Sequence, residues 1–152
     1  MKLLTLDKDH AQSMAALHAQ AFETPWDAPA FESLLAGPGV FALAVQGDSS
    51  LEALILMRAI AGEAEILTLA TAPAHRGRGL ARTLLKAALT LSAEAGAQKA
   101  FLEVAHDNRA AIALYQDSGF SPSGRRPGYY ARASGPAADA IVLSRGLDPG
   151  GA

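Results

Sequence analysis

Between residues 63 and 105, an apolar run, a glycine-rich turn, a helical segment and a second apolar run follow one another. The run at Glu63–Thr71 has the composition of a strand. Apolar residues then recur at helical spacing between residues 79 and 95, until Gly96 ends the segment. Lys99–Ala105 again has the composition of a buried strand. A strand, a helix and a second strand in this order predict an α/β chain with a helix on the face of a sheet.

The remaining segments place several strands before this unit. Strands are predicted at residues 2–6, 40–46, 51–61, 63–71 and 99–105, with two more near the end, the last at 140–143. Helices are predicted from residue 7 or 9 to about 22, and at 29–35, 79–95 and 108–118. This order predicts a mixed, mostly antiparallel sheet flanked by about four helices.

Length and composition predict a single domain. The chain has 152 residues, half of them hydrophobic, and contains neither an internal repeat nor an interdomain linker. We expect the domain to span residues 1–147 and residues 148–152 to form a disordered tail. No apolar run reaches the ~18–20 residues of a membrane span, and the polar start is unlike a signal peptide, so we expect a cytoplasmic protein that binds no membrane.

Charge is unevenly distributed along the chain. The net charge of −2 argues against binding to nucleic acid, which usually requires a broadly basic surface. Residues 66–93, however, contain no acid, and this window holds Arg76, Arg78, Arg82 and Lys86. Such an excess predicts a small polyanionic ligand, although a basic face that pairs with acids elsewhere would give the same pattern.

Gly77 and Gly79 lie in the turn between the predicted strand and helix. Backbone N–H groups at a helix start are free to bind an anion, and glycine lets a phosphate approach without a Cβ in the way. The turn lacks the Gly-Lys-Ser/Thr of a P-loop and the full dinucleotide-binding pattern, which disfavours nucleoside triphosphates and NAD. By itself, this stretch is also compatible with a simple tight turn.

The segment from Arg76 to Ala81 matches the R/Q-x-x-G-x-G/A pattern of the GNAT superfamily of N-acetyltransferases. The predicted order of elements resembles this fold along nearly the whole chain. Further motifs are similar to the branch of bacterial ribosomal-protein-alanine N-acetyltransferases. They are Pro25-Trp26, Leu102-Glu103-Val104, Asn108-x-x-Ala111-Ile112-Ala113-Leu114-Tyr115, Gly119-Phe120, Gly128-Tyr129-Tyr130 and Asp139-Ala140.

This resemblance implies that acetyl-CoA is the cosubstrate. In the family, the backbone of the glycine-rich turn holds the pyrophosphate, which maps here to Arg76, Gly77, Arg78, Gly79, Leu80, Ala81 and Arg82. The end of the preceding strand bulges and its backbone binds the acetyl and pantetheine units, which maps to Leu69, Ala70 and Thr71. The pantetheine arm is also expected to contact Asn108, although an asparagine there could simply cap a helix.

Two side chains are candidates for the chemistry. Glu103 is a carboxylate inside an otherwise apolar strand, and the resemblance implies that it accepts the proton of the amine, through water or directly. Tyr115 shares a helical face with Asn108, and the resemblance implies that it protonates the thiolate of coenzyme A. The alternatives are a Glu103 that points to solvent and a Tyr115 that only fills the core.

The acceptor is expected to be the N-terminal amine of a ribosomal protein. The resemblance places Trp26, Arg126, Tyr129 and Tyr130 beside the acceptor peptide, although aromatic residues in loops would also fit the edge of the core or a plain surface. An α-amino group has a pKa of ~7.7–8.0 and lysine one of ~10.4, so a single modest base suffices for an N-terminus. The chain has no cysteine, which excludes an acyl-cysteine intermediate and predicts direct attack in a ternary complex. The four histidines lack metal-ligand spacing, so no metal is expected.

Two other functions fit the same residues. The acceptor could be a small-molecule amine such as a polyamine, an amino acid or an antibiotic. The chain could also be a non-catalytic module that binds acyl-CoA, although such a module would need neither Glu103 nor Tyr115.

Overall fold

The computed structural model of the chain describes residues 2–130 and 135–148. Its strands are β1 (Lys2–Leu6), β2 (Val40–Gln46), β3 (Leu51–Ile60), β4 (Glu63–Thr71), β5 (Lys99–Ala105), β6 (Ser121–Tyr130) and β7 (Ala138–Gly146). The helices are α1 (Ala11–Ala21), α2 (Ala28–Leu35), α3 (Leu80–Glu94) and α4 (Arg109–Asp117), with short 3-10 turns η1 (Lys8–His10) and η2 (Pro73–His75). Within these residues, the predicted class of a mixed sheet with four helices is confirmed.

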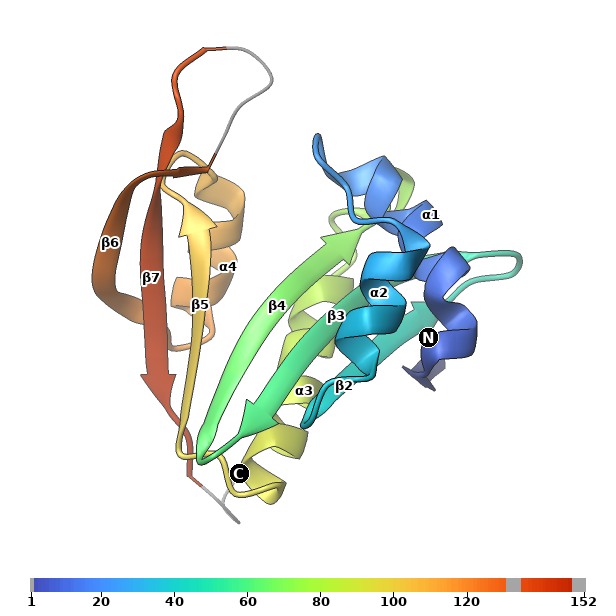
Figure 1. Cartoon of the computed structure of the whole chain (residues 1–152), viewed down its shortest axis with the longest axis horizontal. Coiled ribbons are helices and arrows are strands. Elements are labelled where there is room, and N and C mark those ends of the chain that lie inside the picture. The colour runs from blue at the N-terminus through green and yellow to red at the C-terminus, as the bar shows by residue number, and fades with distance from the viewer. Residues whose placement is uncertain (1, 131–134, 149–152) are drawn as a thin grey trace.

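The seven strands form one sheet in the order β1-β2-β3-β4-β5-β7-β6. All neighbouring strands are antiparallel except β4 and β5, which are parallel. The parallel pairing is short, running only from Glu63 opposite Lys99 to Glu65 opposite Phe101. Beyond it β4 and β5 diverge, and the sheet opens between them (Figure 1). The backbone of both strands is therefore free of sheet pairing along the sides that face this opening.

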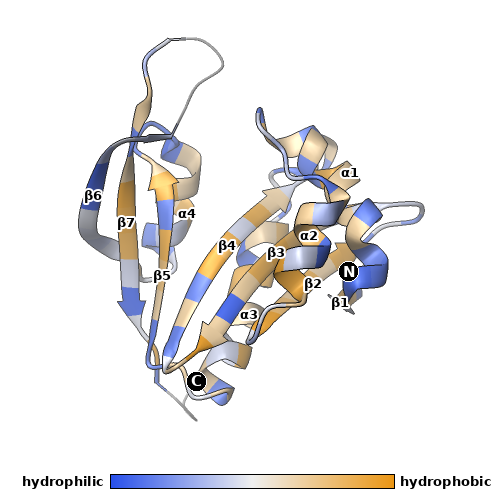
Figure 2. Cartoon of the chain, viewed as in Figure 1, coloured by the Kyte–Doolittle hydropathy of each residue, from blue (hydrophilic) through white to orange (hydrophobic). Residues whose placement is uncertain are grey.

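The central strands are buried on both faces. In β2 and β3, alternate side chains enter two separate core clusters, so that Leu43 and Ile55 belong to one cluster while Ala44 and Leu54 belong to the other. Helix α3 packs on the face that carries Leu43 and Ile55, and α1 and α2 cover the face that carries Ala44 and Leu54 (Figure 1). Burial on both faces explains why these strands have nearly continuous apolar sequences. Figure 2 shows hydrophobic residues along this part of the sheet and hydrophilic ones on β6.

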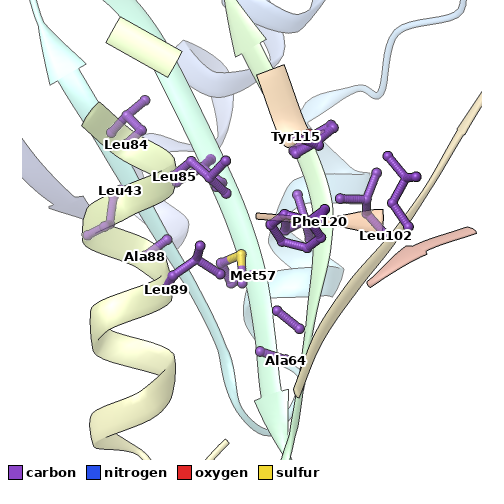
Figure 3. Close-up of a cluster of buried hydrophobic side chains, with 14 of the residues drawn as sticks. Leu43, Met57, Ala64, Leu84, Leu85, Ala88, Leu89, Leu102, Tyr115 and Phe120 are labelled. Atoms are coloured by element: carbon purple, nitrogen blue, oxygen red, sulfur yellow. The ribbon is translucent and has the colours of Figure 1, made fainter. Parts of the chain in front are cut away.

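The core cluster on the α3 side joins the strands on both sides of the opening between β4 and β5. Leu84, Leu85, Ala88 and Leu89 of α3 contact the sheet, while Tyr115 and Phe120 bring α4 and the turn after it into the same cluster (Figure 3). The rings of Tyr115 and Phe120 meet edge to face, with their centroids 5.7 Å apart. This cluster therefore anchors α4 next to the opening between β4 and β5.

A β-bulge in β4 reverses the direction of its side chains. Leu56 pairs with Thr68 but Met57 pairs with Ile66, so Leu67 is an extra residue. Before the bulge, even-numbered residues such as Ile66 face the α3 side, whereas after it they face the α1 side. This one-residue shift turns Thr68 towards α1.

The hairpin between β3 and β4 has two residues in the left-handed region, Ala61 at φ 53° and Gly62 at φ 81°. Positive φ at both central positions is the pattern of a type I′ turn, whose twist matches that of the flanking strands. Alanine is poorly suited to this region, so the turn is built at a conformational cost.

The final strand is longer than the sequence indicated. The prediction of 140–143 was wrong in length, because β7 runs over Ala138–Gly146. It pairs with β5 on one side and β6 on the other, so sheet hydrogen bonds carry the strand beyond its apolar centre. Apart from Asp148, the expected tail at 148–152 lies outside the described residues, and the domain boundary at residue 147 stays a prediction. The described residues contain no helix long and apolar enough to cross a membrane.

Candidate active site

A cleft of about 760 Å³ lies where β4 and β5 diverge. Its walls are residues 66–69 of β4, residues 102–105 of β5, the end of α1 with the loop after it, the start of α4, and Tyr129 and Tyr130 of β6. We call it the β4–β5 cleft. Of the residues singled out from the sequence, it brings together Trp26, Leu69, Glu103, Asn108, Tyr115, Tyr129 and Tyr130.

Glu103 is held by contacts that its position in the sequence did not indicate. Its Oε1 accepts a hydrogen bond of 2.7 Å from the Arg126 guanidinium, and its backbone carbonyl accepts one of 3.0 Å from the Tyr130 hydroxyl. Its Oε2 is buried and has no hydrogen-bond partner among the described residues. The carboxylate is therefore an ion-paired side chain in the cleft wall, with one oxygen left to accept a hydrogen bond or a proton.

Tyr115 lies in both the core and the cleft. Only 6% of the residue is exposed. Burial raises the pKa of Tyr115, and the nearby Tyr130 raises it further. The phenol therefore stays protonated at neutral pH, which is the form that a proton donor needs.

Asn108 caps helix α4 and lines the cleft as well. Its Oδ1 accepts a hydrogen bond of 3.2 Å from the Ala111 N–H. The capping alternative is thus correct, and it leaves the side-chain amide N–H groups available to a ligand. Its neighbour along the chain, Asp107, also lines the cleft.

The glycine-rich turn forms an open start to helix α3. Gly77 and Gly79 have φ values of 79° and 76°, and a Cβ on either would meet no described atom beyond the chain neighbours within 4 Å. The N-cap residue is Gly79, which has no side chain to cap the helix, and the Thr83 N–H donates to the Gly79 carbonyl at 3.1 Å. The backbone N–H groups of residues 80–82, which come before Thr83 in the first turn of the helix, thus lack intrahelical acceptors. This local structure fits an anion such as a pyrophosphate.

Two of the arginines expected to face that anion are paired with acids. Arg78 lies 3.6 Å from the Glu52 carboxylate and donates to His75 Nδ1 at 2.7 Å, and Arg82 lies 3.4 Å from the Asp117 carboxylate. Two of the four cations of the basic face, Arg78 and Arg82, therefore pair with acids elsewhere, so the alternative interpretation holds for this part of the face. The pair of Arg82 with Asp117 is exposed on both sides, and such pairs are worth only about 0–1 kcal/mol, so a polyanion can compete for this arginine.

The other residues expected to bind acetyl-CoA divide between cleft and core. Leu69 lines the cleft. The side chains of Ala70 and Leu80 are buried in the two core clusters, so any ligand contact from them would come from the backbone. The bulge of β4 is at Leu67, two residues before the segment Leu69–Thr71 where we expected it.

The residues expected beside the acceptor differ in their surroundings. Trp26, Tyr129 and Tyr130 line the cleft, and Tyr129 is 49% exposed. Arg126 lies outside the cleft lining, with its guanidinium carbon 4.0 Å from the centre of the Tyr129 ring while the group also pairs with Glu103. Arg126 thus connects the carboxylate to an aromatic wall of the cleft.

A buried polar pair, His18 and Thr68, lies beside Trp26 and was not predicted. His18 is 2% exposed and Thr68 is 8% exposed, and both line the cleft. The ring nitrogen Nε2 of His18 lies 2.9 Å from Thr68 Oγ1, and Nδ1 accepts a hydrogen bond of 2.9 Å from the Trp26 backbone N–H. Burial lowers the pKa of His18 to about 4. The position of His18 on the same helical face as Met14 was the one available signal of its burial.

The site has no arrangement suited to a metal ion in the part of the chain that the structure describes. There, no group of three or more His, Cys, Asp or Glu side chains could hold one. Glu103 Oε2 and the Tyr115 hydroxyl are suited to proton transfer, the first as an acceptor and the second as a donor.

Comparison with known proteins points to one family. The family model described as "Acetyltransferase (GNAT) family" matches residues 11–120. The chain is 38% identical over 146 residues to the N-alpha-acetyltransferase RimI of Mycobacterium tuberculosis, covering 92% of this chain and 89% of the relative. It is 30% identical over 132 residues to the [ribosomal protein bS18]-alanine N-acetyltransferase of Escherichia coli K12, covering 86% and 88%. A crystal structure of the ribosomal-protein-S18-alanine N-acetyltransferase from Escherichia coli superposes with a TM-score of 0.89 at 25% identity, covering 97% of this chain and 94% of that one.

Proposed function

Because the chain belongs to the acetyltransferase (GNAT) family, whose members use acetyl-CoA, we propose that it acetylates the N-terminal α-amine of a protein, with a ribosomal protein that begins with alanine as the expected acceptor. The names of its relatives support this acceptor. The observation that carries the proposal is Glu103 Oε2, a buried carboxylate oxygen without a partner among the described residues, in the wall of the β4–β5 cleft.

The glycine-rich turn and the start of α4 fit acetyl-CoA. The uncapped start of α3 offers N–H groups to the pyrophosphate, with open space beside Gly77 and Gly79. The unpaired edge of β4 and the Asn108 amide offer hydrogen bonds to the pantetheine arm. When bound, acetyl-CoA supplies the acetyl group as a thioester.

Glu103 would act as the base. Arg126 occupies Oε1, so Oε2 is the oxygen that can accept the proton of the attacking amine, directly or through water. An α-amine with a pKa of ~7.7–8.0 is about one-tenth neutral at pH 7, so the base needs to remove a proton only as the new C–N bond forms. Since the chain has no cysteine, the amine would attack in a ternary complex rather than through an acyl-cysteine.

Tyr115 would act as the acid. Its phenol is protonated at neutral pH because burial raises its pKa. It would give this proton to the departing sulfur as the C–S bond breaks. The proton accepted by Glu103 then returns to solvent, and the Tyr115 phenolate takes a proton from solvent, which restores both groups. Bonds and protons balance: one amide and one thiol form from one amine and one thioester.

The test compares acceptors by the release of free thiol from acetyl-CoA. Peptides that begin with alanine, serine or leucine and a peptide with a blocked N-terminus and an internal lysine are offered separately. We expect turnover with the alanine peptide and little with the blocked one. Glu103→Gln should lower kcat by ~10²–10⁴-fold, whereas Glu63→Gln, at the exposed start of β4, should not. Equal rates with the blocked peptide would refute the α-amine as acceptor.

A small cationic amine is the second candidate. Besides Glu103, the carboxylates of Glu23 and Asp107 line the cleft, and several acids in one cleft favour a polyamine. Adding spermidine to the same thiol-release assay distinguishes the two. Turnover confined to spermidine would favour this candidate over a protein N-terminus.

A further inference from the structure

We propose that the hydroxyl of Thr68 donates a hydrogen bond to a backbone carbonyl of the acceptor peptide, and that His18 is the positioning residue that aims it. This inference rests on the proposed function for the identity of the acceptor. It assigns roles to two residues of the β4–β5 cleft that the proton-transfer chemistry does not use.

A chain of two hydrogen bonds fixes the polarity of the Thr68 hydroxyl. The Trp26 N–H donates to His18 Nδ1 at 2.9 Å, so that nitrogen carries no proton in the neutral ring. The proton of a neutral imidazole is then on Nε2, which lies 2.9 Å from Thr68 Oγ1 and must donate to it. Burial lowers the pKa of His18 to about 4, which keeps the ring neutral at physiological pH.

The His18 ring is held rigidly in this orientation. It stacks on Phe22 and Trp26, with ring centroids 4.2 Å and 5.0 Å away, and forms a T-shaped pair with Phe31 whose centroid is 5.3 Å away. The ring therefore cannot rotate to offer its other nitrogen to Thr68 without losing these contacts and the bond to Trp26.

Thr68 is left with one hydrogen to donate. Its oxygen accepts from His18, and no acceptor for its own hydrogen occurs among the described residues. A hydroxyl hydrogen that is buried without an acceptor costs free energy, and a carbonyl oxygen in the cleft would remove that cost. The bulge at Leu67 turns Thr68 towards α1, and Thr68 lines the cleft there.

The location favours the acceptor over acetyl-CoA. The hydrogen-bond chain starts at Trp26 in the loop after α1, which packs against the core cluster on the α1 side of the sheet. Asn108 and Tyr115, proposed for the pantetheine arm and its sulfur, belong to the N-cap and body of α4, and Tyr115 packs in the cluster on the α3 side. Thr68 thus belongs to the wall formed by α1 and β4. A peptide that lies along this wall presents backbone carbonyls, which are the acceptors that a lone hydroxyl donor selects.

The experiment uses three variants and separates acceptor binding from cosubstrate binding. Thr68→Val keeps the shape but removes the hydroxyl, Thr68→Ser restores the hydroxyl, and His18→Phe keeps the ring stacking but removes both hydrogen bonds. We measure KM and kcat for the alanine peptide and the Kd of acetyl-CoA by calorimetry. The emission of Trp26, the only tryptophan of the chain, reports on the loop.

For Thr68→Val we expect a KM for the peptide roughly 3- to 10-fold higher, with the acetyl-CoA Kd and Trp26 emission unchanged. Thr68→Ser should recover most of the affinity. His18→Phe should raise KM at least as much and also shift the emission of Trp26. If Thr68→Val leaves the KM for the peptide unchanged, or raises the Kd of acetyl-CoA instead of this KM, the inference is overturned. The proposed function stays intact in either case. A wild-type protein that acetylates no α-amine would refute the proposed function and the inference with it.

Discussion

Replacing Gly79 by alanine separates the conformational role of this residue from its proposed role in binding. Gly79 is the N-cap residue just before helix α3 and has a φ of 76°, and Gly62 in the β3–β4 hairpin has a similar φ of 81°. A Cβ at either position meets no described atom beyond the chain neighbours within 4 Å. Gly62→Ala is therefore a matched control, with the same backbone strain at a site away from the glycine-rich turn.

The loss of stability should be small and equal in the two variants. Alanine in the left-handed region costs about 1–2 kcal/mol relative to its preferred conformations. The lower entropy of alanine in the unfolded chain offsets about 0.4–1 kcal/mol of this. The net loss of about 1 kcal/mol should lower Tm by about 2–4 °C in a chain of this length.

Only Gly79→Ala should weaken the binding of acetyl-CoA. Its new methyl group stands at the helix start where the N–H groups would meet the pyrophosphate, so we expect a Kd at least about tenfold higher, equivalent to about 1.4 kcal/mol. Thermal unfolding and calorimetry of both variants provide the comparison. If Gly79→Ala and Gly62→Ala bind acetyl-CoA equally well, the helix start does not hold the pyrophosphate.

Three further changes test other parts of the account. Tyr115→Phe should keep the acetyl-CoA Kd but lower kcat by ~10²–10⁴-fold, and a near-normal kcat with chemistry rate-limiting would remove Tyr115 from the mechanism. Ala61→Asn should raise the free energy of unfolding in urea by about 0.5–1 kcal/mol, because asparagine tolerates the left-handed turn at φ 53°; an unchanged midpoint would contradict this. The folded-state pKa of His18, about 4, lies below its ordinary 6.5, so the unfolded state binds more protons between these values. Stability should therefore fall by up to about 3 kcal/mol as pH drops from 6.5 to 4, and a profile parallel to that of His18→Gln would refute the burial argument.

Local patterns predicted the elements of the fold. Glycines at 77, 79 and 96 delimit α3, and the apolar spacing between them indicates its buried face. These signals act within a few residues of each other, so the chain alone reveals them. The placement of Glu103 in an apolar strand was visible in the same way.

The partners of the site residues could not be predicted, because they are distant in sequence. Arg126 pairs with Glu103 across 23 residues, and His18 meets Thr68 across 50. The second contact also depends on the bulge at Leu67. An unbroken strand would turn Thr68 to the same face as Ile66, towards α3 and away from His18.

The central claim is that the acetyl group goes to an N-terminal α-amine. One peptide that begins with alanine and also carries an internal lysine, incubated with the protein and acetyl-CoA, lets the two amines compete in the same molecule. Fragmentation in the mass spectrometer then locates the acetyl group. The account predicts a single acetyl group on the alanine nitrogen, formed in step with free coenzyme A. Acetylation of the lysine, or thiol release without an acetylated peptide, would contradict it.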